Sequence, residues 1–277
     1  MQIQQARAHI MATLASGESP RADADALLCH LLDCRRSYLM TWPEHELDAA
    51  QQATLAGWLA RRLNGEPIAH LIGEREFWSL PLKVSPATLI PRPDTEVLVE
   101  QALARLQDGP CALLDLGTGT GAIALALKSE RPDADVWAVD RMPAAAALAR
   151  TNSAVLGLPI EVRDGSWFAP LSDAPRFAMI VSNPPYIDGT DPHLHEGDVR
   201  FEPRSALVAD EQGLADIRLI VAGAPAHLCP GGWLLLEHGW EQGALVRQLL
   251  LQQGYCQVET VRDYGDNERV TLGRLAP

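Results

Sequence analysis

The sequence has little cysteine, no long apolar run and few basic residues. Its five cysteines form an odd set without a Cys-x-x-Cys pair, which argues against a disulfide framework and a structural zinc site. The histidines, among them His70, His193, His195 and His238, show no metal-ligand spacing, so no metal is expected. No apolar run approaches the roughly 18–20 residues that a membrane span requires, and the amino terminus lacks a signal-peptide pattern. We therefore expect a cytoplasmic protein without a membrane partner.

Acidic residues outnumber basic ones, with 36 Asp and Glu against 23 Lys and Arg, and the net charge is −13. A sequence-independent grip on nucleic acid needs a basic surface, whereas the longest basic runs here are the pairs Arg35-Arg36 and Arg61-Arg62. Direct binding of free duplex DNA is therefore not expected. A negatively charged protein attracts cationic small molecules and basic protein partners. Many proteins, however, are acidic only because charge keeps them soluble.

The 277 residues suffice for one large or two ordinary domains. Residues 1–64 carry apolar side chains at three-to-four spacing and predict a small helical domain. Within it Ser19-Pro20 is typical of a helix start and Asn64-Gly65 of a helix end. Residues 65–93 hold short β-like pieces broken by prolines, which indicate a β-hairpin-like connector to a second domain, residues 94–277.

From Cys111 onward, strand-like and helix-like segments alternate. We predict strands over residues 112–116, 136–139, 160–162, 177–182, 233–237, 256–261 and 269–275. We predict helices over residues 122–129, 143–156, 213–222 and 243–253. Such alternation implies βαβ crossovers. The expected fold is therefore α/β and Rossmann-like, with a mostly parallel seven-stranded sheet after a small helical domain.

A glycine-rich loop follows the first predicted strand of this second domain and opens a helix. The loop consists of Gly117, Thr118, Gly119, Thr120 and Gly121. The next strand ends at Asp140, 23 residues after Gly117, where a carboxylate can accept hydrogen bonds from ribose hydroxyls. The spacing fits a dinucleotide site, with Ala122 in the last position, and equally the G-x-G-x-G loop of class I S-adenosylmethionine-dependent methyltransferases, with Asp115 two residues before it. A structural turn without a ligand is the remaining alternative.

The tetrapeptide Asn183-Pro184-Pro185-Tyr186 follows the strand predicted over residues 177–182. Two prolines end the strand because neither has an N–H for the ladder. The segment then presents an Asn side chain, rigid carbonyls and an aromatic ring at a strand carboxyl end, where ligands bind in open α/β sheets. The Asn183 oxygen and a proline carbonyl can each accept one N–H of a planar amine or amide, and the Tyr186 ring can lie against it. A proline-rich turn that merely caps the strand is the alternative.

The two motifs together resemble those of amino-group methyltransferases, and longer stretches resemble the release factor glutamine methyltransferase family. These stretches are residues 77–84, 89–96, 181–187, 201–203, 206–207 and 266–270. The likeness covers essentially the whole chain and is weakest over the first sixty residues. A related family that acts on a ribosomal-protein glutamine shares the connector and the Asn-Pro-Pro-Tyr segment. Residues 237–240 and the Asp266-Asn267-Glu268-Arg269 tail fit the release factor family better.

The resemblance implies transfer of a methyl group from S-adenosyl-L-methionine to the amide nitrogen (N5) of the glutamine in the Gly-Gly-Gln motif of class I peptide chain release factors. It implies that residues 117–121 cradle the methionine part of the cofactor and that Asp140 holds the ribose. Trp167 would border the adenine, with Asp164 as second choice, because Ser166 stands where the family often has an acid. The glutamine amide would be held by Asn183, Pro184, Pro185 and Tyr186, with Asn183 also bordering the cofactor. The residues 1–64 would help to recognise the protein substrate.

Three other functions compete with this interpretation. A nucleic-acid amino-methyltransferase would share both motifs, but the acidic balance and the lack of a basic segment count against it. A nicotinamide dehydrogenase would leave Asn183-Pro184-Pro185-Tyr186 unexplained. A non-enzymatic binding module is disfavoured by the intact glycine loop together with Asp140 and Asn183.

Overall fold

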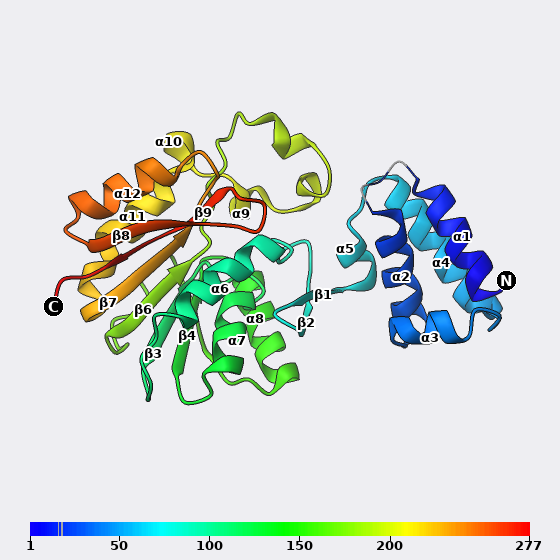
Figure 1. Ribbon diagram of the computed structural model, residues 1–277, viewed down its shortest axis with the longest axis horizontal. Coiled ribbons are helices and arrows are strands. Elements are labelled where there is room, and N and C mark those ends of the chain that lie inside the picture. The colour runs from blue at the N-terminus through cyan, green and yellow to red at the C-terminus, as the bar shows by residue number, and fades with distance from the viewer. Residues whose placement is uncertain (16, 18) are drawn as a thin grey trace. The chain divides into compact units, whose positions relative to one another are not determined.

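The computed structural model describes residues 1–277 apart from residues 16 and 18. It divides into two compact units (Figure 1). The helical unit comprises Met1–Glu74 and Gly197–Phe201, and the sheet unit comprises Arg75–Glu196 and Glu202–Pro277. This division joins most of the proposed connector to the sheet unit, and the three-part division into 1–64, 65–93 and 94–277 stays a prediction.

In the described part of the helical unit, five α-helices surround an apolar core. They are α1 (Ile3–Thr13), α2 (Pro20–Leu31), α3 (Arg36–Thr41), α4 (Ala49–Leu63) and α5 (Ile68–Ile72). Fully buried side chains of this core include Ile3, Ile10, Leu27, Leu28 and Leu55. Asp48 begins α4, since its side chain accepts the N–H of Gln51 at 2.7 Å. Ser19 does precede α2, with Pro20 in the first turn, but its side chain makes no capping hydrogen bond.

A short segment from late in the chain completes the helical unit. We call Gly197–Phe201 the strap; it includes the 3₁₀ helix η3 (Val199–Phe201). Asp198 accepts a hydrogen bond from Arg62 Nη1 at 2.9 Å, and Arg62 also lies 3.5 Å from Asp23. Arg200 reaches the carbonyl oxygen of Asn64 at 3.5 Å. The strap is therefore fixed to the carboxyl end of α4 by polar contacts.

The sheet unit is built on a seven-stranded sheet in the order β5-β4-β3-β6-β7-β9-β8 (Figure 1). Its strands are β3 (Ala112–Leu116), β4 (Asp135–Asp140), β5 (Glu161–Asp164), β6 (Phe177–Ser182), β7 (Leu228–Glu237), β8 (Cys256–Arg262) and β9 (Glu268–Arg274). All pairs are parallel except those of β9 with β7 and β8. The predicted fold class is confirmed, and the seven predicted strands all form, with β7 beginning five residues earlier than expected because Leu228 already pairs with Phe177.

Helices cover both faces of this sheet. One face carries α6 (Glu96–Leu103), α7 (Ala122–Glu130) and α8 (Pro143–Leu156), and the other carries α11 (Ala215–Gly223) and α12 (Gly243–Gln252) (Figure 1). The remaining short helices are η1 (Pro93–Thr95), η2 (Pro192–His195), α9 (Arg204–Leu207), α10 (Asp210–Gly213) and η4 (Ala224–Ala226). The helix predicted over residues 213–222 begins only at Ala215, because Glu211, Gln212 and Gly213 have left-handed backbone. Two apolar cores result, one on each side of the sheet.

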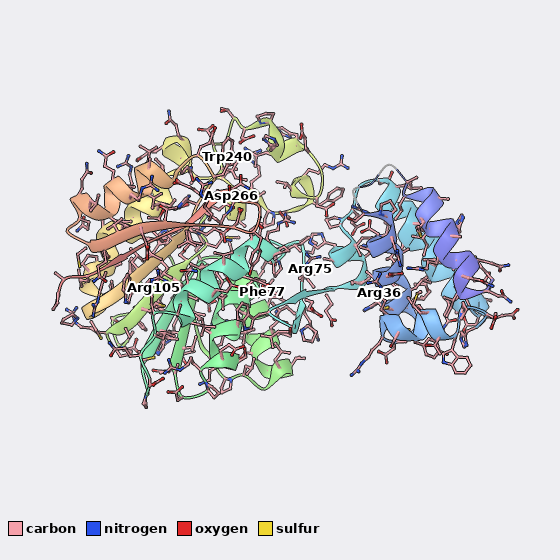
Figure 2. All side chains as sticks on the ribbon, in the orientation of Figure 1. Arg36, Arg75, Phe77, Arg105, Trp240 and Asp266 are labelled. Atoms are coloured by element: carbon pink, nitrogen blue, oxygen red, sulfur yellow. The ribbon has the colours of Figure 1, made fainter. Side chains whose placement is uncertain are left out.

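The hairpin β1 (Glu74–Phe77) and β2 (Leu80–Lys83) packs on the first of these cores. Phe77 is 1% exposed and belongs to that core (Figure 2). Asn152, buried on α8, accepts the N–H of Lys83 at 2.9 Å and donates to the carbonyl oxygens of Lys83 (3.0 Å) and Thr120 (2.8 Å). One side chain thereby joins the hairpin, α8 and the glycine loop.

No helix among the described residues is long and apolar enough to cross a membrane. Within the same residues, no group of three or more His, Cys, Asp or Glu side chains is arranged to hold a metal ion.

Candidate active site

A pocket opens where the strand order of the sheet reverses. β4 and β5 lie on one side of β3, whereas β6 and β7 lie on its other side. The loops that follow β3 and β6 therefore separate at this point. Crevices at such a switch point are where ligands bind in open α/β sheets, so the place of the pocket suits a cofactor and the reacting end of a substrate.

The glycine loop forms one wall of the pocket. Gly117, Thr118, Gly119 and Thr120 line it, and the loop folds back so that the Gly117 and Thr118 N–H groups donate to the Val139 carbonyl at 2.8 and 3.0 Å. Gly121 is not among the lining residues. A side chain there would meet Leu125 at 3.1 Å and Ala149 at 3.3 Å, which shows that Gly121 allows α7 and α8 to pack closely.

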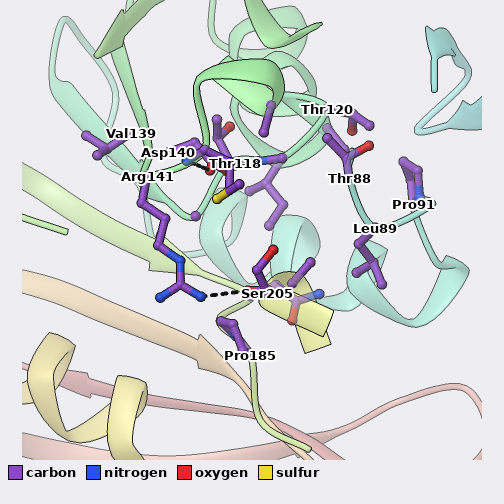
Figure 3. Close-up of a pocket in the computed structure, with 18 of the residues that line it drawn as sticks. Thr88, Leu89, Pro91, Thr118, Thr120, Val139, Asp140, Arg141, Pro185 and Ser205 are labelled. Carbon is purple, nitrogen blue, oxygen red and sulfur yellow. Dashed lines mark hydrogen bonds between the residues drawn. The ribbon is translucent and has the colours of Figure 1, made fainter. Parts of the chain in front are cut away.

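Asp140 ends β4 and lines the pocket beside this loop (Figure 3). Its Oδ2 accepts the Gly119 N–H and its Oδ1 accepts the Met142 N–H, both at 2.8 Å. Burial raises the pKa of the carboxyl, and the two backbone donors oppose that rise. Each oxygen keeps a lone pair for a further donor, so the carboxylate can accept from vicinal hydroxyls while it holds the loop.

Asp115 lies beneath the loop and is completely buried. Its Oδ2 accepts the Thr118 hydroxyl at 2.6 Å and the Ala124 N–H at 3.3 Å. Burial raises the pKa of Asp115 to about 7. Its Oδ1 has no hydrogen-bond partner in the described part of the chain. Asp115 therefore supports the loop from below and does not line the pocket.

The structure distinguishes the two residues expected near the adenine. Trp167 lines the pocket, and its ring lies 3.5 Å from where a side chain on Gly117 would begin. Asp164 instead points to solvent, with a side chain 51% exposed, and pairs with Arg150 at 3.0 Å. The first choice is thus in place to contact a flat base, and the second is not among the lining residues.

The Asn-Pro-Pro-Tyr segment divides between the pocket and the core. Asn183 and Pro185 line the pocket, whereas Pro184 is buried beside them and is not a lining residue. The Asn183 Nδ2 donates to the Thr95 hydroxyl at 3.2 Å. The Tyr186 ring packs against the second core, and its hydroxyl donates to Glu237 Oε1 at 3.2 Å. Tyr186 therefore holds the segment in place more than it forms the pocket wall.

Sequence reasoning missed part of the pocket wall. Thr88, Leu89, Pro91 and Arg92 from the connector line it, as do Ser205 and Ala206 from α9 (Figure 3). Glu202, whose side chain is fully buried, accepts the Ile90 N–H at 2.9 Å and pairs with Arg92 at 2.7 Å. Arg141 donates to the Ser205 carbonyl at 2.9 Å, as the dashed line in Figure 3 marks. The proline-punctuated pattern of residues 86–93 was the available signal for this wall.

Family models match most of the chain. Residues 5–73 match the PrmC N-terminal domain, and residues 93–198 match the methyltransferase small domain. A release factor glutamine methyltransferase of Salmonella typhimurium is 61% identical over 265 residues, covering 95% of each chain. Proteins of the same name from Escherichia coli and Pseudomonas aeruginosa are 60% and 57% identical and cover 94% and 95% of each chain.

Solved structures with lower identity share the fold. A methyltransferase from Pyrococcus furiosus is 18% identical with a TM-score of 0.56, and the match covers 80% of this chain and 100% of that one. A 16S rRNA N2 G1207 methyltransferase from T. thermophilus, solved with AdoMet and guanosine, is 20% identical with a TM-score of 0.53, and covers 73% of this chain and 49% of that one.

Proposed function

The chain belongs to the release factor glutamine methyltransferase family, and from that premise we propose that it transfers a methyl group from S-adenosyl-L-methionine to the side-chain amide nitrogen (N5) of the glutamine in the Gly-Gly-Gln motif of class I peptide chain release factors. The observation that carries the proposal is the meeting of the glycine loop, Asp140 and Asn183 in one pocket. The reaction would take place in the cytoplasm and support translation termination.

The lining residues fit S-adenosyl-L-methionine. When bound, this cofactor supplies a methyl group on a positively charged sulfur. The residues 117–120 present backbone groups and a helix amino terminus, the Asp140 carboxylate can accept from ribose hydroxyls, and the Trp167 ring can lie beside adenine.

Asn183 and Pro184 would act on the substrate amide. An amide nitrogen is a poor nucleophile because its lone pair is delocalised into the carbonyl. The Asn183 Oδ1 and the Pro184 carbonyl oxygen would accept its two N–H bonds and so favour the positive charge that develops as the nitrogen reacts. A fixed orientation of the nitrogen supplies much of the remaining rate. One amide proton would then leave to water.

The helical unit would contribute to recognition of the protein substrate. A single glutamine in a large partner needs contacts beyond the reacting atoms. Met40 and Trp42, at and after α3, are each 57% exposed. Large exposed apolar side chains of this kind are typical anchors of a protein interface.

Transfer of radiolabel tests the proposal. The purified protein is incubated with labelled S-adenosylmethionine and, separately, with a release factor, its variant with Ala in place of the glutamine of Gly-Gly-Gln, a ribosomal-protein mixture and duplex DNA. Label in the wild-type release factor alone is the expected result. Label in ribosomal protein or in DNA would keep the cofactor but replace the substrate, and label nowhere would oppose the proposed activity.

A further inference from the structure

Asn183 has an amide group whose two ends have opposite character. Its oxygen accepts hydrogen bonds and its NH₂ donates them, so only one orientation can receive the N–H groups of a substrate amide. In the structure the Nδ2 donates to Thr95 Oγ1 at 3.2 Å. Thr95 ends η1, is 4% exposed and borders the same pocket. The contact commits the nitrogen of Asn183 to the protein and leaves its oxygen for a ligand.

Thr95 alone would not fix this orientation, because a hydroxyl can both donate and accept. It has only one proton, however, and its side chain interacts with the buried carboxyl group of Glu237. Glu237 ends β7 and is 2% exposed. When Glu237 is ionised its carboxylate can only accept, so the Thr95 proton is directed to Glu237 and the Thr95 oxygen accepts from Asn183. In that state the polar contacts run in one direction, from Asn183 through Thr95 to Glu237.

We propose that Thr95 and Glu237 are positioning residues, which orient the amide of Asn183 so that its oxygen faces the amide to be methylated. This inference rests on the proposed function. Glu237 has a second contact with the same segment, since its Oε1 accepts the Tyr186 hydroxyl at 3.2 Å. Glu237 thus holds Tyr186 directly and interacts with Thr95, the hydrogen-bond partner of Asn183.

The surroundings of Glu237 support a role that stability alone does not explain. Its Oε2 is buried and has no hydrogen-bond partner among the described residues, an arrangement that costs folding free energy. Burial raises the pKa of Glu237 to about 7, Asp94 adds to that rise, and Arg269, Thr95 and Tyr186 oppose it. Arg269 is itself paired with Asp263 at 3.0 Å. A well-packed apolar residue would suit this position better if it served the core alone.

A Thr95 series in the full-length protein tests the inference. Thr95→Val removes the hydroxyl at nearly constant volume, and Thr95→Ser retains it. We measure kcat and KM with a release factor and the cofactor Kd by calorimetry. Thr95→Val should lower kcat about 10-fold or more, as expected for a hydrogen bond in a charged chain, with a cofactor Kd within about threefold of wild type. Thr95→Ser should recover most of kcat.

Glu237→Gln and a double variant give independent tests. Gln keeps the shape of Glu237 but can donate to Thr95 and so reverse the chain, which should lower kcat as Thr95→Val does. Because Thr95 acts through Asn183, adding Thr95→Val to Asn183→Ala should lower the residual rate no further.

The possible outcomes separate this inference from the proposed function. A normal kcat for Thr95→Val, an equal loss for Thr95→Ser, or a cofactor Kd that weakens in step with kcat would each overturn the positioning role. A wild-type protein that labels a ribosomal-protein glutamine instead would overturn the proposed substrate, and the same variants would then be compared on that acceptor. A wild-type protein that labels no amide would overturn both.

Discussion

The Asp140 carboxylate accepts the backbone N–H of Gly119 at 2.8 Å. This bond joins the end of β4 to the glycine loop after β3, so two features that the sequence presents 21 residues apart form one wall of the pocket. A change at Asp140 therefore acts on the ligand contacts and on the loop together.

Replacing Asp140 should weaken cofactor binding. In Asp140→Ala both the expected ribose contact and the bond to Gly119 are lost, so the cofactor Kd should rise about 10- to 100-fold, equivalent to roughly 1.4–2.8 kcal/mol. Calorimetric titration with S-adenosylmethionine measures it. Asp164→Ala is the matched control, because Asp164 ends the neighbouring strand in register with Asp140 but is paired with Arg150 outside the pocket. Equal Kd values for the two variants would contradict the assignment.

Replacing Asn183 should affect turnover and spare cofactor binding. Asn183→Ala removes the acceptor for the substrate amide, and losses of one such preorganised group typically cost about 100-fold or more in kcat. The cofactor Kd should stay within about threefold, because the other lining residues remain. Single-turnover methylation and a binding titration on the same preparation separate the two effects. Normal turnover would remove Asn183 from the receptor.

Gly213 should be intolerant of a side chain. It has a φ of +82°, and a Cβ there would lie 2.0 Å from the carbonyl oxygen of Tyr186. Gly213→Ala should lower the free energy of unfolding by about 2–5 kcal/mol, from overpacking and left-handed backbone together, and should lower kcat by displacing Tyr186. Gly157→Ala is the control: its φ is +65° with open space around it, so a loss of only about 1 kcal/mol is expected. Urea unfolding measures both, and similar losses would contradict the steric argument.

Asp115 should make stability depend on pH. The pKa of the folded carboxyl is about 7 against an ordinary value of 3.8. Between these values the folded state holds a proton that the unfolded state has released, so the contribution of Asp115 to stability falls as the pH rises from about 4 to about 7. The slope approaches about 1.4 kcal/mol per pH unit for one such group. Urea unfolding at pH 5, 6 and 7 should show a shallower decline in Asp115→Asn, and parallel curves would contradict the prediction.

The sheet was predictable because its signals are local. β3 and β6 coincide with the apolar runs predicted over 112–116 and 177–182, and each ends where glycine or proline stops the pattern. Gly117, Asp140 and Asn183 follow strand ends, and parallel strands end at one edge of a sheet. Their meeting in one pocket therefore follows from the strand order.

The rest of the pocket depends on contacts between distant residues. Thr95 meets Asn183 across 88 positions, and Glu202 meets Ile90 across 112. No periodicity or spacing reports such pairs, so the connector was interpreted as a link between domains rather than as a pocket wall. The Tyr186 ring was expected at the ligand because its motif stands at a strand carboxyl end, but its hydroxyl donates to Glu237 at the end of β7. Burial in the second core and the hydrogen bond to Glu237 therefore determine where the Tyr186 side chain points.

The strap has consequences for proteolysis of the chain and for its folding during synthesis. The chain passes between the two units after Glu74, after Glu196 and after Phe201. A fragment that stops at Glu74 therefore lacks Asp198, the partner of Arg62, and no single scission of the backbone releases the helical unit whole. During synthesis the five amino-terminal helices leave the ribosome more than a hundred residues before the strap does. The helices of the helical unit are therefore synthesised first, but the unit is complete only when the strap follows, after β3 to β6 have been synthesised.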